Sequence, residues 1–241
     1  MVSAVWRMKP FAFKQMWEHF GYEYLPYPLS VRPTSDTIEE HRLEQLDAID
    51  EALKTLREWY EPALVALSDP EVRVEILGRR AGELIRVHVG VRDEISCIAT
   101  QVPGREPDIG GDVTLRAVRS VDVGRALVKM FDINVSGAFR EWRFSGRATD
   151  ADEQAKEREL EMLTANGVDG ILPVGILPGP IVDNWDAQPG TLSFDIIHVR
   201  GKGDFVLNKG ARQVVSATPD ATAKAFDTYI SAVRRTYESR G

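Results

Sequence analysis

Five side chains could hold a metal ion or carry acid–base or nucleophilic chemistry: His19, His41, His88, His198 and Cys97. The first two histidines lie in helix-like segments, and neither has a second histidine at a ligand spacing. His88 and His198 lie in strand-like segments, at places that could correspond in two halves of the chain. They could form a metal or acid–base pair, or be half-buried strand residues with backbone partners. We favour the second reading, since a site needs convergent groups that the sequence does not show.

The remaining motifs also argue against catalysis. Cys97 alternates with Ile95 and Ala99, which predicts a small core residue rather than a nucleophile with a nearby base. No phosphate-binding loop, dinucleotide fingerprint, G-x-S-x-G or H-E-x-x-H occurs, and "DIGGD" at 108–112 has no basic residue to hold a phosphate. The sequence therefore predicts a protein that is not an enzyme, with no cofactor and no metal.

Charge and hydropathy limit the classes of partner that we expect for this protein. The formal charge of −7 argues against nucleic acid, which usually requires a basic face. No apolar run approaches the ~18 residues that would span a membrane. The N-terminal "MVSAVWRMKPF" has neither the apolar core nor the cleavage site of a signal peptide. We therefore expect a cytoplasmic protein that binds neither nucleic acid nor membrane.

The first third of the chain predicts helices around a proline-containing connector. Apolar residues at three- and four-residue steps predict a short helix over 11–20, and Gly21 ends it. In "LPYPLSV", Pro26 and Pro28 force extended backbone, so the connector should lie flat against an apolar surface. A second helix begins near Thr37. Its seam, listed here, should pack on a helix or sheet: Leu46, Ile49, Leu53, Leu56 and Tyr60.

Short alternating segments then predict an antiparallel sheet. Four strands over 72–118 are joined by two tight turns and one longer loop, and a helix follows Ser120. Three further strands over 191–218 precede a last helix, which starts at Thr218. The class is therefore α+β. Both halves run from a helix through strands to a closing helix, which suggests a single domain, 1–241, made of related halves, 1–131 and 132–241.

The segment "GILPVGILPGPIVDNW" at 170–185 combines core-like aliphatics with three prolines. Because proline limits hydrogen bonding in sheets and helices, we expect an irregular surface path with at most one edge strand. Core-like side chains on the surface are easiest to explain if a partner covers them. The predicted partner-binding residues are Ile176, Leu177, Ile181 and Trp185.

Three stretches carry a resemblance that spans nearly the whole chain: "LPYPLSV", "ALSDPEVRVEI" and "DVTLRAVRSVDVGRALV". In order and spacing the chain resembles the EspG family, the secretion-associated chaperones of actinobacterial type VII (ESX) systems. The resemblance implies a central antiparallel sheet flanked by helical bundles in two quasi-twofold related halves. It also implies cytosolic binding of PE–PPE-like helical secretion substrates, whose apolar tip the chaperone shields.

Some features depart from the family. The hairpin "GRRAG" at 78–82 is short where some members have a long substrate-gripping loop, and the long loop is "VPGREPDIGGD" at 102–112. Two other readings stay open, a small-ligand-binding or hydrolytic α+β enzyme and an immunity-type inhibitor of a co-encoded toxin. The sequence also leaves open whether the chain forms a homodimer.

Overall fold

The computed structural model describes residues 5–32, 35, 37–58, 61–104, 106, 109–134, 139–144, 151–165, 167–180 and 189–239. Its helices are α1 (Pro10–His19), α2 (Ile38–Glu58), α3 (Glu61–Ser68), α4 (Val123–Met130), α5 (Ala151–Thr164) and α6 (Pro219–Glu238), with a 3-10 turn, η1 (Ser120–Asp122), before α4. Its strands are β1 (Val5–Met8), β2 (Val72–Arg80), β3 (Glu83–Arg92), β4 (Ile95–Pro103), β5 (Gly110–Arg119), β6 (Glu141–Arg143), β7 (Val168–Pro178), β8 (Leu192–Val199), β9 (Gly203–Asn208) and β10 (Gln213–Ser216).

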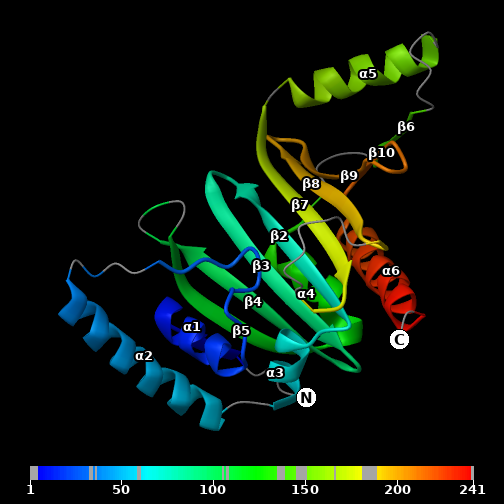
Figure 1. The fold of residues 1–241 in the computed structure, drawn as a ribbon. Helices are drawn as coiled ribbons and strands as arrows, with labels where there is room; N and C mark the ends of the chain where they lie inside the picture. Colours follow the sequence, from blue (N-terminus) through cyan, green and yellow to red (C-terminus); the bar gives the residue numbers. More distant parts are fainter. Residues whose placement is uncertain are drawn as a thin grey trace.

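All the described strands join one ten-stranded antiparallel sheet, in the order β1-β5-β4-β3-β2-β7-β8-β9-β10-β6 (Figure 1). The predicted α+β class is confirmed. Counted outward from the central β2–β7 pair, the order is β2-β3-β4-β5-β1 on one side and β7-β8-β9-β10-β6 on the other. Each half thus adds its strands in the same sequence. A quasi-twofold relation in space and flanking helical bundles stay predictions.

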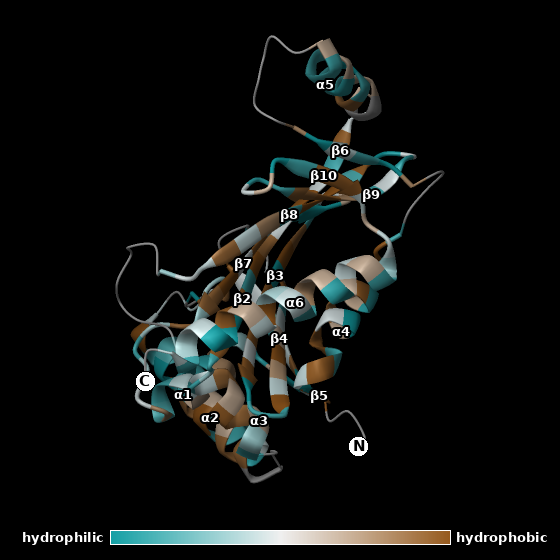
Figure 2. Cartoon of the chain, turned by 90° about the vertical axis from the view of Figure 1, so that its right-hand side faces the viewer, coloured by the Kyte–Doolittle hydropathy of each residue, from teal (hydrophilic) through white to brown (hydrophobic). Residues whose placement is uncertain are grey.

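Helices cover both faces of the sheet. Because side chains alternate along a strand, each face can be followed by residue parity. Val74, Val89 and Val174 point to one face, where they pack with Leu127 of α4 and Phe226 of α6. Figure 2 shows α4 and α6 side by side against the hydrophobic strands. On the opposite face, α1 and α3 cover the strands of the N-terminal half, including the buried Cys97.

Close backbone approaches set these positions. A Cβ on Gly90 would lie 1.9 Å from the carbonyl oxygen of Ala66 in α3, so only glycine lets α3 lie directly on β3. A Cβ on Gly124 would lie 2.3 Å from the carbonyl oxygen of Ala223, which fixes the α4–α6 crossing in the same way. The N–H of Gly124 also donates to Asp227. Small residues therefore determine how closely these helices approach.

The connector after α1 packs as predicted. Pro26, Pro28 and Leu29 are buried, while Tyr24 and Tyr27 remain exposed. Ser30 and the Gln101 side chain of β4 exchange two hydrogen bonds, with N–O distances of 2.8 and 2.9 Å. The connector therefore lies against the face of the sheet that carries α1 and α3.

The predicted path of the segment from Gly170 is wrong for the described residues. β7 is not an edge strand but lies at the centre of the sheet, paired with β2 and β8. The β2–β7 register lacks Leu77 and Gly78, the residues opposite Pro173 and Leu172, and resumes at Arg79. Pro173 is thus tolerated at a gap in the β2–β7 hydrogen-bond ladder, and Pro178 lies at the end of the strand. The alternating apolar residues outweigh the prolines.

Candidate functional site

The two strand histidines belong to different networks. His88 is fully buried, and its Nδ1 donates to the carbonyl oxygen of Tyr27 across 2.9 Å, as expected for a strand histidine with a backbone partner. Burial lowers the pKa of His88 to about 4, the bond to Tyr27 opposes this shift, and the charge of Arg73 adds to it. His88 is therefore neutral at neutral pH and is held by the connector.

His198 has a carboxylate partner instead of the expected backbone group. Its Nδ1 lies 2.9 Å from Oδ1 of Asp204, a side chain with no solvent exposure. Asp204 also accepts from Arg80 at 2.6 Å and from the backbone N–H of Asn134 at 2.9 Å. This network joins β2 of the N-terminal half to β8 and β9 of the C-terminal half. Its ion pair is structural, because the carboxylate is already saturated by donors.

The remaining candidates are the Cys97 thiol and side chains that could hold a metal ion. Burial raises the pKa of the Cys97 thiol to about 12, so it is not a nucleophile at neutral pH. Among the described residues, no three histidine, cysteine or acidic side chains gather as metal ligands. None of the helices in the described part of the chain has the length and apolar character to cross a membrane.

One stretch of the central sheet leaves apolar side chains uncovered, on the face opposite α4 and α6. Leu77 of β2, Leu84 of β3, and Ile171 and Pro173 of β7 form this surface, which we call the β2–β7 patch. Ile171 is 47% exposed. The patch lines a depression of about 510 Å³ near the turn between β2 and β3.

The two strands that carry most of the patch, β2 and β7, pack closely against each other. A Cβ on Gly78 would lie 2.1 Å from the carbonyl oxygen of Ile171, so glycine is needed where β2 and β7 approach each other. Charges border the depression: Arg79 and Asp169 line it, and Asp195, paired with Pro173 in register, binds Lys209 at 2.8 Å. An apolar centre with a charged rim is typical of a protein-binding surface.

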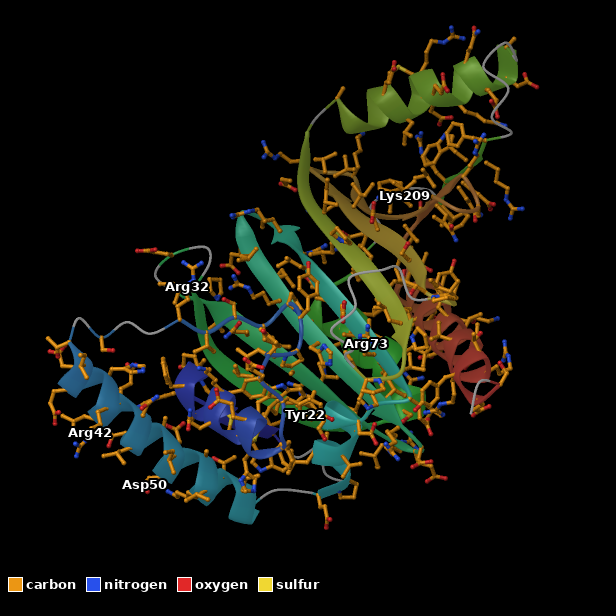
Figure 3. All side chains as sticks on the ribbon, in the orientation of Figure 1. Tyr22, Arg32, Arg42, Asp50, Arg73 and Lys209 are labelled. Atoms are coloured by element: carbon orange, nitrogen blue, oxygen red, sulfur yellow. The ribbon has the colours of Figure 1, made fainter. Side chains whose placement is uncertain are left out.

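A buried cluster borders this surface below the connector. Nη1 of Arg73, on β2, donates to the carbonyl oxygens of Pro178, Gly179 and Pro180, and its Nε lies 2.8 Å from Glu75. Figure 3 shows Arg73 in the middle of the sheet, between the connector and β7. These bonds fix the end of β7, where the chain leaves the sheet.

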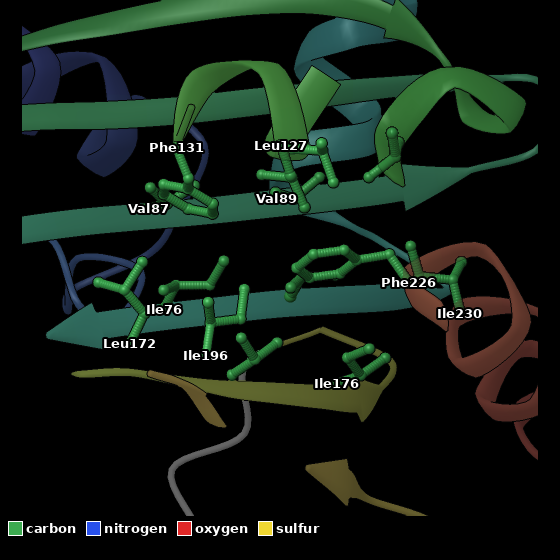
Figure 4. Close-up of a cluster of buried hydrophobic side chains, with 14 of the residues drawn as sticks. Ile76, Val87, Val89, Leu127, Phe131, Leu172, Ile176, Ile196, Phe226 and Ile230 are labelled. Carbon is green, nitrogen blue, oxygen red and sulfur yellow. The ribbon is translucent and has the colours of Figure 1, made fainter. Parts of the chain in front are cut away.

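The predicted partner-binding residues differ in burial and in the face of the sheet on which they lie, and two of them are outside the described residues. The Ile176 side chain is fully buried between the sheet and α6, near Phe226 and Ile230 (Figure 4), so it cannot serve as a surface anchor. Leu177 is half-buried on the other face, the face of the β2–β7 patch. Ile181 and Trp185 lie outside the described residues. Sequence reasoning missed Ile171 and Pro173, although the alternation in "GILPVGILP" could have revealed them.

The long loop at 102–112 is only partly described. Val102 at its start is 48% exposed, and the N–H of Gly104 donates to the carbonyl oxygen of Ile109 across 2.9 Å. It is a second surface on which a partner could be held, separate from the patch in sequence and strand.

Comparison with protein families matches the chain to the model of the EspG family over residues 10–174. The match includes α1 to α5 and most of β7, with Ile171 and Pro173 of the β2–β7 patch. A comparison with curated proteins gave no match. Since the matched region covers more than half of the 241 residues, the chain belongs to the EspG family.

Proposed function

We propose that this protein is a cytoplasmic chaperone that binds PE–PPE-like helical substrates of a type VII secretion system and acts without catalysis. Membership of the EspG family supports the general part, a chaperone in type VII secretion that interacts with secretion substrates. The observation that carries the contact surface is the β2–β7 patch, an apolar area left open at the centre of the sheet.

The mechanism follows from burial. A helical hairpin that exposes an apolar tip tends to self-associate, and covering the tip on another apolar surface removes that tendency. Ile171, Leu84 and Leu77 supply the apolar contacts, and Arg79 with the Asp195–Lys209 pair supplies charges that select among substrates. Leu177, Ile181 and Trp185 remain proposed contacts, because they continue from the same strand.

Paired variants test the contact surface. Ile171→Asp should weaken binding of a purified helical substrate at least about thirtyfold, since an anchor at the centre of an interface typically contributes ~2 kcal/mol or more. Val102→Asp is the control, because Val102 is also on a strand and 48% exposed, against 47% for Ile171. Binding is measured by calorimetry, and melting temperatures establish that both variants are folded.

The same two variants also indicate where the contact lies if the proposal is wrong. Binding that survives Ile171→Asp but is lost in Val102→Asp would place the contact at the 102–112 loop instead. Unchanged binding in both variants would show that the β2–β7 patch is not the contact surface. Ile181 and Trp185, the predicted contacts outside the described residues, would then be the next residues to mutate.

A further inference from the structure

The apolar surface of the β2–β7 patch continues across the C-terminal half of the sheet. Residues directly opposite each other on antiparallel strands point to the same face. Ile171 of the patch is paired with Ile197 of β8, and Ile197 is paired with Phe205 of β9. Alternation along β9 puts Leu207 on this face as well. The face then continues outward through residues that are paired in this order: Leu207 of β9, Val214 of β10 and Trp142 of β6.

Helix α5 covers the outer part of this face. Leu160 of α5 packs on a small apolar cluster of the sheet, which we call the α5 seat: Trp142, Ile197, Val199, Phe205, Leu207 and Val214. Figure 1 shows α5 at the end of the sheet where β7 begins. Ile197 is half-buried in the seat and is also the register partner of the exposed Ile171. The open patch and the covered seat are therefore adjoining parts of one apolar surface.

Polar contacts to the edge of the sheet hold α5 in place. Glu159 of α5 lies 2.7 Å from Arg140 in an ion pair whose side chains are 45% and 48% exposed, and it accepts from the indole N–H of Trp142 at 3.0 Å. Lys156 donates to the carbonyl oxygen of Arg143 at 3.0 Å. All three partners belong to β6, the last and three-residue strand of the sheet, or directly precede it. Exposed ion pairs contribute little to stability, so these contacts are individually weak.

The apolar contact of α5 is small. Among its described side chains, Leu160 is only partly buried and Met162 is 69% exposed. The most buried of these side chains is an acid, Glu153, at 3% exposure. Removing a carboxylate from water has a desolvation cost that its partners have to offset. Burial of apolar area therefore supplies little of what holds this helix on the seat.

A glycine with room to rotate joins α5 to the patch strand. Gly167 directly precedes β7 and has a φ of +94°, and a Cβ at this position would meet nothing within 4 Å. Glycine reaches this backbone region and its neighbours without steric cost, and residues at element ends commonly absorb hinge rotations. Rotation at Gly167 can therefore move α5 off the seat while β7 keeps its pairing with β2 and β8.

We propose that α5 is a displaceable cover of the docking surface, and that a helical secretion substrate bound at the β2–β7 patch extends onto the α5 seat as α5 swings away. This inference rests on the proposed function. The seat already accepts a helix, α5 itself, and it is continuous with the patch through the Ile171–Ile197 pair. Without substrate, α5 keeps Trp142 and Phe205 out of water, at 3% and 4% exposure. The cover thus competes with the substrate for one apolar surface.

Loosening the cover tests the competition. Apparent affinity is reduced by the fraction of molecules in the closed state, so a variant that opens more easily binds more tightly. Glu159→Ala removes the contacts to Arg140 and Trp142 and should tighten binding of a purified helical substrate at least about fivefold. Glu157→Ala is the matched control, because it removes the same charge from an exposed position of α5 and should leave the affinity unchanged. Calorimetry measures binding, and melting curves establish that both variants are folded.

Locking the cover tests the movement. Cys97 is fully buried, so a thiol reagent reacts with introduced cysteines only. The double variant Arg140→Cys, Glu159→Cys is joined by a short crosslinker that a reductant cleaves. The crosslinked form should bind substrate at least about tenfold more weakly than the same protein after cleavage, because α5 can no longer leave the seat.

Two results would overturn the inference and leave the proposed function standing. The first is equal affinity of the crosslinked and cleaved forms, which would show that binding does not require α5 to move. The second is weaker binding by Glu159→Ala than by Glu157→Ala, which would make α5 a contact for the substrate and not its competitor. Absence of substrate binding by the wild type, by Glu159→Ala and by the cleaved form would contradict the inference and the proposed function together.

Discussion

His88 shows how one residue can make stability depend on pH. Its pKa in the folded chain is about 4, below the ordinary value of 6.5, because burial penalises the charged ring. Between these two values the unfolded chain binds the extra proton and the folded chain does not. Protonation of His88 therefore does not affect the free energy of unfolding above about pH 6.5. As the pH falls toward 4, it lowers that free energy progressively.

We predict a loss of as much as about 3 kcal/mol from this residue over that range, using 1.36 kcal/mol per pKa unit. Unfolding of the wild type and His88→Gln by urea, measured between pH 7 and pH 4, gives the comparison. The gap between the two free energies of unfolding should change in favour of the variant as the pH falls. A gap that stays constant across the range would mean that His88 titrates with the same pKa in the folded and the unfolded chain.

Arg80 is the second residue whose surroundings give a definite expectation. It supplies the main charge that balances the fully buried Asp204, with two hydrogen bonds of 2.6 and 3.1 Å. Removing one partner of a buried pair leaves the other charge uncompensated, so Arg80→Met should lower the free energy of unfolding by ~3 kcal/mol. Arg79→Met, one position away and bonded to the carbonyl of Gly82, should cost less than about 1 kcal/mol.

Chemical denaturation separates these two outcomes. Equal losses in the two variants would show that the Arg80–Asp204 pair makes no special contribution to joining the two halves.

At the scale of elements, the connector combines rigidity with burial. Pro26 and Pro28 are both buried, and the carbonyl of the residue between them accepts the hydrogen bond from His88. Replacing both prolines with alanine frees the unfolded chain and should lower stability by about 1 to 2 kcal/mol. Thermal unfolding measures that loss, and substrate binding by the folded fraction should persist. A double variant that keeps its melting temperature but no longer binds substrate would make the connector a recognition element.

The elements also show what sequence patterns can and cannot determine. The strands of the N-terminal half and the final helix follow from alternation, turn residues and the Thr218–Pro219 start, where Thr218 accepts from the N–H of Ala221. β7 could not be predicted in the same way. Its prolines argued for an irregular path, and only the pairing gap opposite Pro173 and the close approach at Gly78 show how a central strand accommodates them. Tertiary packing overrode the local propensity.

The same limit explains why the exposed residues of the candidate site could not be predicted from the sequence. Exposure of Ile171 and burial of Ile176 depend on which face of the sheet α6 covers, because the two side chains point to opposite faces of β7. Helix α2 gives the opposite case, because the prediction of a packed seam is wrong for Leu46, Ile49 and Leu53, which are 51%, 39% and 46% exposed. Its helical period was evident, but burial was not, because Ala48 and Ala52 occupy the contact with α1. Periodicity identifies an apolar face and does not say what covers it.

For the whole molecule, the proposed substrate contact lies at the middle of the sheet. The β2–β7 patch is at the junction of the halves, while α2 lies on the outer side of α1 within the N-terminal half (Figure 1). A substrate can therefore be bound at the centre of the molecule without contacting α2.

The central claim, that this protein is a chaperone for helical type VII secretion substrates, is tested most directly by co-expression. Each helical substrate encoded by the type VII loci of the host would be produced with and without this protein, and soluble fractions analysed by size exclusion. We predict that at least one substrate is insoluble or aggregated alone and co-elutes with this protein as a defined soluble complex. If every such substrate remains unbound and its solubility is unchanged, the chaperone account is contradicted.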